Sequence, residues 1–545
     1  MAAESPSRRP RLSVAMIVRN EQDVLAATID SARSIADEIL VLDTGSTDET
    51  PAIAEQLGAS VSRALWNDDF SDARNRLMDK ATGDWVLWLD AGEWLTAESA
   101  GRLRAFLDRD ADPRTVYLLM VEAPSADPAS SNEQAARPRL LPKHRALRFT
   151  GRVRETLDPS IEAAGLAVDL APGRILRHAR FHDSERKARI AQRDLKLIAL
   201  EATENSQPQP RLLIALGEAC SNLDDQAGAR RAFFQAVRQA PRGSTEMLEA
   251  YYGLLSTFNG SPIRQRDRQV AVCLEALEIY PLDAQLLSAM GSYLQAQNRL
   301  DLAARAFETA VRYGKIDPKT WHLCEIAEMA SAFLALTLQM LGKHDEARRV
   351  LEEALTRWQG SARIRRHLID LCVKLGQSEE AIRVADALPM DDDQREPLLN
   401  AIRGASKAAR QDWLAALGLL QSAYAAGCRE PLCLKWLAVT LLSNGQTDAA
   451  RPVLREWLQI EPHNAEVRAY LNVLERDFAA AEPDLVEPVP TQSEHEAAES
   501  RPAIEADPSR RIRIDPGTTV TVVTPPRMPI IHQALSTDAI MSPNG

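Results

Sequence analysis

The chain has 545 residues, of which 45% are apolar and 26% charged, and its formal net charge is −12. One hydrophobic core rarely serves so long a chain, so two or three globular domains are expected. The acidic balance argues against nucleic-acid binding, because no basic stripe would neutralise phosphates, and no apolar run reaches about eighteen residues, the length that spans a bilayer, so no transmembrane segment is expected.

Three short apolar runs in the first ninety residues each end in polar residues. Each run is too short for a buried helix and is bounded by turn formers, so each predicts a buried parallel strand. Ligands of open α/β sheets bind beyond the carboxyl ends of such strands, so the three ends predict one site for a polar, metal-associated ligand. The runs and the residues after them are Arg11–Val18 with Asn20 and Glu21, Glu38–Leu42 with Asp43, and Asp84–Leu89 with Asp90.

Strand and helix patterns alternate over residues 12–205, which is typical of a doubly wound α/β domain. A capping-box pattern at Ser46–Glu49 predicts a helix that runs through Leu57 and stops at Gly58. After Asp90 the pattern is less regular, and a long helix is expected to begin at Ser184. The further strand-like runs between these points are Val116–Val121, Arg139–Leu141, Phe149–Val153 and Arg174–His178.

Residues 210–478 have a purely helical pattern that repeats. Similar six-residue blocks begin at Gly342, Gly376 and Gly445, with a weaker copy at Arg410, so the starting positions step by 34, 34 and 35 residues. That step is the tetratricopeptide period, which predicts helix pairs stacked into an all-α superhelix. Three tryptophans of this region are expected to pack within the repeats: Trp321, Trp436 and Trp457.

Composition also predicts whether the C-terminal tail is folded and in which cellular compartment the protein lies. Residues 480–545 are rich in Pro, Glu, Ser and Thr without sustained periodicity, so we expect a disordered tail. The six cysteines are scattered and never form a C-x-x-C pair, which favours free thiols in a reducing cytoplasm. No secretory signal is expected in the Ser-, Arg- and Pro-rich first eleven residues, so the predicted location is cytoplasmic.

Four sequence blocks of the first domain together resemble glycosyltransferase family 2, in the bacterial branch whose catalytic domain is followed by tetratricopeptide repeats. The resemblance implies a GT-A-type nucleotide-sugar-binding domain over residues 12–205 and a repeat array over residues 210–478, and it leaves only the tail, residues 480–545, without a counterpart. The blocks are S-V-A-M-I-V-R-N-E from Ser13, E-I-L-V-L-D-T-G-S-T-D-E-T from Glu38, W-N-D-D-F-S-D-A-R-N from Trp66 and A-T-G-D-W-V-L-W-L-D-A-G-E from Ala81.

The resemblance implies donor-binding roles for side chains at the strand ends. Asp43 would accept hydrogen bonds from the uracil of a UDP-sugar; alternatively, it is a turn aspartate that accepts from local backbone N–H groups. Asn20 and Glu21 would line the nucleotide pocket, although Glu21 could instead cap the next helix. Arg74 would lie near the diphosphate, which its fork geometry suits, or would form a surface ion pair with a neighbouring aspartate.

A metal site is implied at Asp90-Ala91-Gly92-Glu93, where family members usually carry D-A-D-E. Asp90 would bind the donor through a divalent cation, Mn²⁺ or Mg²⁺, which stabilises the departing nucleoside diphosphate. Gly92 replaces the second metal-binding aspartate, and this loss should weaken the site unless Glu93 compensates. His178 aligns with a family histidine that completes the metal site, but a structural role is as plausible.

A candidate catalytic base follows from a second block. The family tends to show F-x-G-x-V-H-E, and this chain has Phe149–Glu155 with Arg154 in place of the histidine. An inverting transferase needs a carboxylate that takes the acceptor proton. Glu155 is the candidate for that role, with Arg154 lowering its pKa; alternatively, Glu155 caps the following segment.

Two hypotheses from different classes follow. The first is a glycosyltransferase that moves a sugar from a nucleotide-diphosphate donor, expected to be a UDP-sugar, to a protein or glycan acceptor with inversion, while the repeats bind the acceptor or a partner protein. The alternative is an interaction scaffold whose front domain is a degenerate transferase. Gly92 and Arg154 favour the scaffold, whereas Asp43, Asp90 and Glu155 favour the enzyme.

Overall fold

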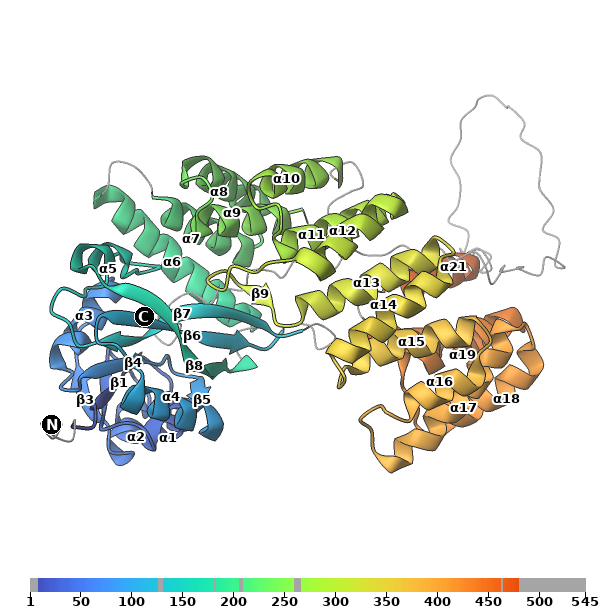
Figure 1. Ribbon diagram of the computed structural model, residues 1–545, viewed down its shortest axis with the longest axis horizontal. Coiled ribbons are helices and arrows are strands. Elements are labelled where there is room, and N and C mark those ends of the chain that lie inside the picture. The colour runs from blue at the N-terminus through green and yellow to red at the C-terminus, as the bar shows by residue number, and fades with distance from the viewer. Residues whose placement is uncertain are drawn as a thin grey trace, which may run out of the picture. The chain divides into compact units, whose positions relative to one another are not determined.

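The computed structural model describes residues 8–125, 131–179, 183–204, 209–258, 266–461 and 464–479. These residues fall into two compact units (Figure 1). The first comprises the described residues up to Tyr293 together with Arg305–Met329, and the second comprises Leu294–Ala304 and the described residues from Ala330 on. The predicted tail, residues 480–545, lies outside the described residues.

The first unit is built on a mixed β-sheet. Its strands are β1 (Leu12–Val18), β2 (Glu38–Asp43), β3 (Ser60–Arg63), β4 (Trp85–Trp88), β5 (Glu93–Leu95), β6 (Thr115–Ala123), β7 (Glu133–Pro142), β8 (Ala167–Arg177) and β9 (His322–Leu323). They lie in the order β3-β2-β1-β4-β7-β6-β8-β5, and β9 pairs with β7. The pairs β2–β3, β1–β2, β1–β4 and β6–β8 are parallel, whereas β4–β7, β6–β7, β5–β8 and β7–β9 are antiparallel.

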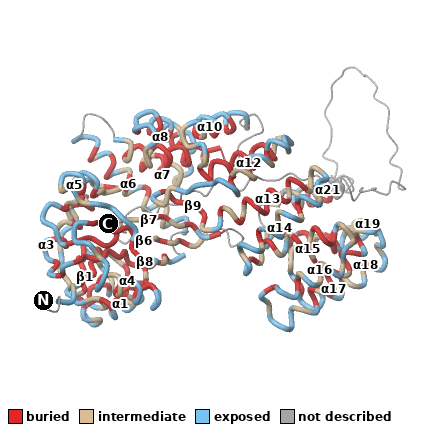
Figure 2. Tube along the Cα trace, viewed as in Figure 1, coloured by how far each residue is buried: buried red, intermediate tan, exposed pale blue. Residues whose placement is uncertain are grey.

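The three strands predicted from the first ninety residues are β1, β2 and β4, and they lie side by side in parallel. Every residue of β1 and β4 is buried, as the red segments of Figure 2 illustrate. Parallel strands covered on both faces are apolar along their whole length, which explains their uninterrupted apolar runs. Their carboxyl ends share one edge of the sheet, so the predicted convergence of the three polar ends is confirmed.

Helices surround this sheet, and side-chain caps fix the start of two of them. Asp69 accepts from the backbone N–H of Asp72 at the start of α3, and Thr96 accepts from that of Ser99 at the start of α4. The helices before the repeats are α1 (Leu25–Arg33), α2 (Thr50–Gln56), α3 (Phe70–Lys80), α4 (Ala97–Arg109), α5 (Asp158–Ala164) and α6 (Ser184–Glu204).

The strand expected at Phe149–Val153 does not form. The chain makes only an isolated bridge between Thr150 and Thr156 there. Gly151 has φ 101°, a left-handed conformation that interrupts an extended strand. The segment is therefore a turn that carries Glu155, and two short strands that the sequence did not indicate, β3 and β5, complete the sheet edges.

More helices complete the first unit. Gly217 and Gly253 allow α7 and α9 to approach the ring of Phe233, since a Cβ at either glycine would lie 2.6 or 2.4 Å from that ring. These helices are α7 (Pro210–Asn222), α8 (Gln226–Gln239), α9 (Thr245–Ser256), α10 (Arg266–Ile279), and α11 (Ala284–Ala296) and α12 (Leu300–Tyr313), of which the last two also extend into the second unit.

The second unit is a series of helix pairs with the predicted repeat chemistry. Gly342, Gly376 and Gly445 have φ values of 73°, 71° and 74° at the turns, and Gln411 takes the same conformation in the weaker copy. Trp436 and Trp457 are buried in this array, as predicted. Its helices are α13 (Ile326–Met340), whose start lies in the first unit, α14 (His344–Arg357), α15 (Ala362–Lys374), α16 (Ser378–Ala385), α17 (Asp392–Ala409), α18 (Trp413–Ala425), α19 (Pro431–Ser443), α20 (Thr447–Ile460) and α21 (Ala465–Ala479).

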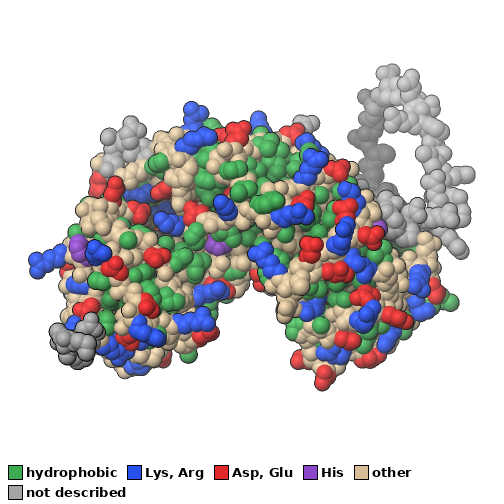
Figure 3. Space-filling model, viewed as in Figure 1, with side chains coloured by type: hydrophobic (Ala, Val, Ile, Leu, Met, Phe, Trp, Pro, Cys, Tyr) green, Lys and Arg blue, Asp and Glu red, His purple; other side chains and the backbone are tan. Residues whose placement is uncertain are grey.

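The helix lengths and the surface charges can be described for the same residues. Within the described ranges, every helix is too short or too polar to cross a lipid bilayer. On the face drawn in Figure 3, basic and acidic side chains are interspersed, without a continuous basic stripe.

Candidate functional site

Polar contacts tie the carboxyl ends of β1 and β2 together. Asn20, at φ 55°, donates its backbone N–H to Ser46 Oγ at 2.9 Å, and its Oδ1 accepts from the backbone N–H of Thr47 at 2.8 Å. Asp43 is 3% exposed and accepts from the backbone N–H of Ser46 at 3.0 Å. Both predicted donor-binding side chains thus lie at neighbouring strand ends, and Asp43 also makes the local turn contact that its alternative role requires.

Glu21 lies beside them and contacts helix α6. Its backbone N–H donates to Thr50 Oγ1 at 2.7 Å, and its buried carboxylate accepts from Arg186 Nη2 at 3.2 Å. The contact with Arg186 links the first strand end to the start of α6. Glu21 therefore connects the sheet edge with this helix, rather than only capping the helix that follows it.

A buried ion network lies where β4 ends. Arg139, on β7, donates from Nη2 to Asp90 Oδ2 at 3.0 Å and to Glu93 Oε1 at 2.8 Å. Arg177, on β8, donates to the same oxygen of Glu93 at 2.8 Å and lies 3.9 Å from Asp90. The network comprises three carboxylates and three arginines, all with side chains at most 6% exposed: Asp90, Glu93, Glu155, Arg74, Arg139 and Arg177.

Arg74 joins the candidate base to this network. Its Nε donates to Glu155 Oε1 at 2.6 Å, and its Nη2 lies 3.5 Å from Asp90 Oδ1. The guanidinium carbon lies 4.7 Å from the ring centroid of Trp88 and 5.3 Å from that of Phe149. Arg74 is therefore not the surface ion pair of its alternative interpretation, because it points inward from α3 between two predicted site carboxylates.

The network is balanced in charge, and its pKa shifts follow from that balance. Burial raises the pKa of Asp90, but Arg139, Arg74 and Arg177 outweigh burial and hold that pKa well below its usual range. Burial lowers the pKa of Arg139, and the carboxylates of Asp90 and Glu93 outweigh it in turn, so this pKa is raised. Asp90 and Arg139 are consequently charged together in the interior.

The residues present do not fit a cation held by a D-x-D element. The carboxylates of Asp90 and Glu93 already accept from guanidinium groups, and Gly92 has no side chain, while its backbone N–H donates to Thr28 Oγ1 at 2.9 Å. His178 is exposed just beyond β8, and its backbone N–H donates to Gly92 O. Within the part of the chain that the structure describes, no three His, Cys, Asp or Glu side chains are grouped to hold a metal ion.

The sequence interpretation missed Arg139 and Arg177 and assigned the wrong partner to Arg154. No local signal marked the first two, because β7 and β8 carry other polar and charged residues as well. Arg154, at φ 48°, points away from Glu155 and donates to Glu249 Oε2 at 2.6 Å, with Glu218 Oε1 at 3.4 Å. The cation beside Glu155 is Arg74.

Comparison with known proteins matches both parts of the chain. Residues 13–137 match the family model of glycosyl transferase family 2, and residues 338–405 match a tetratricopeptide repeat model. The chain contains a glycosyltransferase family 2 domain followed by tetratricopeptide repeats. The family and repeat predictions are therefore confirmed.

The relatives match this chain over short segments rather than over whole proteins. A TPR repeat-containing protein of Synechococcus elongatus is 48% identical over 99 residues, which are 18% of this chain and 25% of that protein. An uncharacterized glycosyltransferase of Rickettsia felis is 39% identical over 88 residues, 16% of this chain and 31% of the relative. The chain thus spans less than a third of the length of these curated relatives.

A solved structure is also similar. The crystal structure of glucosyl-3-phosphoglycerate synthase from Mycobacterium tuberculosis, in complex with Mn²⁺, UDP and glucosyl-3-phosphoglycerate, is 24% identical with a TM-score of 0.18. The similarity covers 21% of this chain and 43% of that chain.

Trp321 belongs to the core of the glycosyltransferase domain, which corrects its predicted role in repeat packing. Its ring lies 5.4 Å from the guanidinium carbon of Arg137 and 5.9 Å from that of Arg177. The segment between α12 and α13 is held there because Ala136 donates its backbone N–H to Pro318 O and β9 pairs with β7. A residue far along the chain therefore packs against an arginine of the ion network.

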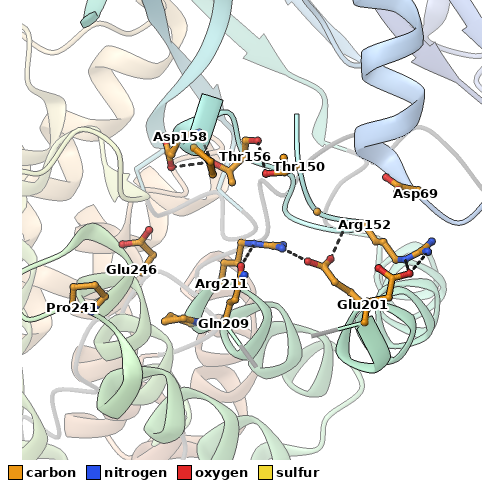
Figure 4. Close-up of a pocket in the computed structure, with 14 residues that line it drawn as sticks. Asp69, Thr150, Arg152, Thr156, Asp158, Glu201, Gln209, Arg211, Pro241 and Glu246 are labelled. Carbon is orange, nitrogen blue, oxygen red and sulfur yellow. Dashed lines mark hydrogen bonds and ion pairs between the residues drawn. The ribbon is translucent and has the colours of Figure 1, made fainter. Parts of the chain in front are cut away.

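A cavity of about 510 Å³ is lined in part by the turn that carries Glu155 (Figure 4). The turn contributes Thr150 and Thr156 to its wall, opposite the end of α6 and the start of α7. Glu201 accepts from the backbone N–H of Arg152 at 2.7 Å and pairs with Arg211. The charged residues that line the cavity are mostly acidic: Asp69, Asp158, Glu201, Glu204 and Glu246, with Arg152 and Arg211.

Proposed function

We propose that this chain transfers a sugar from a nucleotide-diphosphate donor, a UDP-sugar, to an acceptor. The observation that carries the proposal is the position of Arg74, which lies between Asp90 and Glu155 at the edge where three parallel strands end. A cation at that position suits a diphosphate whose negative charge grows as the bond to the sugar breaks. The family match over residues 13–137 supports the same activity.

In this proposal the strand ends bind the nucleotide. Asp43 accepts from the uracil, and Asn20 and Glu21 line the pocket beside it. The side chains of Asp43 and Asn20 contact the same short turn, which supports a shared role. Ligand entry would exchange the Asp43 contact with Ser46 for contacts with the base.

Glu155 is the proposed general base of an inverting reaction. Its Oε1 is oriented by Arg74, and its Oε2 is buried without a hydrogen-bond partner. An oriented carboxylate with one available oxygen can take the proton of an acceptor hydroxyl as that hydroxyl attacks the anomeric carbon. The nucleoside diphosphate then leaves from the opposite face, which inverts the configuration.

The acceptor is proposed to be a protein or a glycan. The cavity beside the turn of Glu155 supports entry from that side, and its acidic lining suits a polar or basic acceptor. The tetratricopeptide array offers an extended surface for the acceptor or for a partner protein. All six cysteines are free, which supports a cytoplasmic location.

One observation favours the alternative, an interaction scaffold with a degenerate transferase domain. Asp90, Glu93 and Glu155 are all buried and paired with arginines. A network whose charges balance without a ligand could have a purely structural role.

Calorimetric titration of UDP into the full chain separates the two. The proposal predicts saturable binding that Asp43→Ala abolishes while circular dichroism shows a retained fold, and that Asp30→Ala, an exposed change on α1, leaves intact. Absence of UDP binding by the folded wild-type chain would favour the scaffold, and undiminished binding by Asp43→Ala would show that the nucleotide site lies elsewhere.

A further inference from the structure

We propose that the arginines of the ion network bind the donor diphosphate directly, so that donor binding needs no divalent cation. The inference rests on the proposed function, because it takes a nucleoside diphosphate as the ligand. It concerns Arg74, Arg139 and Arg177, which come from three different elements and meet around Asp90. None of the proposed contacts with the diphosphate involves a divalent cation.

The first argument is the charge already present. A D-x-D site leaves carboxylates unpaired so that a divalent cation can neutralise them. Here Asp90 and Glu93 are each within 4 Å of two or more guanidinium groups. Because the three arginines already balance the three carboxylates, a divalent cation would add two positive charges that no carboxylate is left to neutralise, which disfavours its binding in a low-dielectric interior.

The second argument is the local backbone. Gly92 stands at φ 89°, where side chains other than glycine are strained, and its N–H is used by Thr28. The turn is thus arranged to hold strand β5 rather than to present a second carboxylate. The glycine in place of the family's second aspartate and the arginine contacts of Glu93 both argue against a metal site at this turn.

The third argument is available donor capacity. Arg139 Nε is buried without a hydrogen-bond partner, although the Nη2 group of the same side chain serves two carboxylates. A buried N–H without an acceptor is costly, and a phosphate oxygen would satisfy it. Arg74 Nη2 makes a long contact of 3.5 Å with Asp90, which a diphosphate oxygen can replace with little loss.

The fourth observation concerns orientation. The ring centroid of Trp321 lies 5.9 Å from the guanidinium carbon of Arg177 and 5.4 Å from that of Arg137, so an aromatic face contacts one arginine of the network and its neighbour. Guanidinium groups held in a fixed plane bind phosphate by paired, directional N–H contacts. Arg177, held by the ring of Trp321 and by Glu93, is therefore preorganised for an anion.

The test is calorimetric titration of UDP into the full chain, first with excess EDTA and then with Mn²⁺ in place of the chelator. We expect saturable binding in EDTA, with a Kd that Mn²⁺ changes by less than about twofold, since the charge is supplied by the protein. Binding only with Mn²⁺, or binding at least about tenfold tighter with it, overturns this inference and leaves the proposed function intact. Absence of binding in both conditions overturns both proposals.

A conservative variant provides the second arm. Arg139→Lys keeps the charge and loses the fork, and should weaken UDP binding in EDTA about tenfold. Arg104→Lys is the matched control, because Arg104 is also a buried arginine of this domain but pairs with Asp37 and Asp108. Wild-type affinity in a folded Arg139→Lys chain would overturn the inference. If that variant does not fold, Arg74→Lys is measured under the same expectation.

Discussion

Replacement of Trp321 by alanine is the sharpest probe of how the later chain supports the transferase core. The indole is 2% exposed and belongs to the same apolar cluster as β1 and β4. Removal of a fully buried aromatic ring typically costs about 3–5 kcal/mol, because the transfer free energy is lost and a cavity remains. Loss of the contacts with Arg137 and Arg177 adds about 0.5–2 kcal/mol when such arginines are desolvated. We therefore expect the first unit to lose about 3.5–7 kcal/mol of its free energy of unfolding.

Hydrogen exchange read by mass spectrometry, together with urea unfolding, measures this loss by segment. The Trp321→Ala chain should exchange faster in β7 and β8, while the helices from α15 onward keep wild-type protection. Trp436→Ala, a buried change in α19, should show the opposite distribution. A loss below about 1 kcal/mol in the first unit, or faster exchange confined to the repeats, would refute the placement of Trp321 in the transferase core.

Two further predictions concern the site and its helical neighbour. Gly92→Asp should lower the free energy of unfolding by about 1–2 kcal/mol, because aspartate is strained at φ 89°, and should not create Mn²⁺-dependent UDP binding. Urea unfolding measures the first effect and calorimetry the second. A UDP complex that Mn²⁺ makes tighter in this variant would contradict the account. Burial raises the pKa of Glu218 from 4.5 to about 8, because the desolvation of its carboxylate, with the repulsion of the Glu249 carboxylate, outweighs the attraction of Arg154. Since this folded pKa lies above the unfolded value, the stability that Glu218 contributes is present below pH 4.5 and is lost as pH rises toward about 8. Glu218→Gln should flatten that decline in a pH series of urea midpoints, and an unchanged slope would contradict the assignment.

Local chemistry accounts for most of what the sequence predicted correctly. The apolar run of β1 and the polar residues after it follow from a strand buried on both faces that ends at a ligand edge. The repeat step follows from the turn conformation at Gly376 and the small Ala381 beneath it, which is fully buried. Such features depend on neighbours within one repeat or one strand, so periodicity reveals them.

The features that the sequence did not reveal depend on distant partners. Arg139 and Arg177 lie 49 and 84 residues beyond the carboxylates they serve, Asp90 and Glu93 respectively. Trp321 lies farther still along the chain from β7, and its helical surroundings favoured a repeat-packing interpretation. No local pattern distinguishes an arginine that neutralises a buried carboxylate from one that reaches solvent at a strand edge.

Arg154 illustrates a different reason for error. Its neighbour Glu155 was the obvious partner by sequence, but a left-handed φ of 48° turns the side chain toward helices α7 and α9. The partners there are Glu249 and Glu218. Backbone conformation at one residue therefore reassigned the cation beside the candidate base from Arg154 to Arg74.

The most direct test of the central claim is release of UDP from a panel of UDP-sugars by the full chain, with water as the acceptor. The account predicts release from at least one donor, slowed by about a hundredfold in Glu155→Gln, because the general base is lost. Glu98→Gln, an exposed change on α4, should match the wild type. A chain that binds UDP but releases none from any donor, or a Glu155→Gln chain as fast as the wild type, would contradict it.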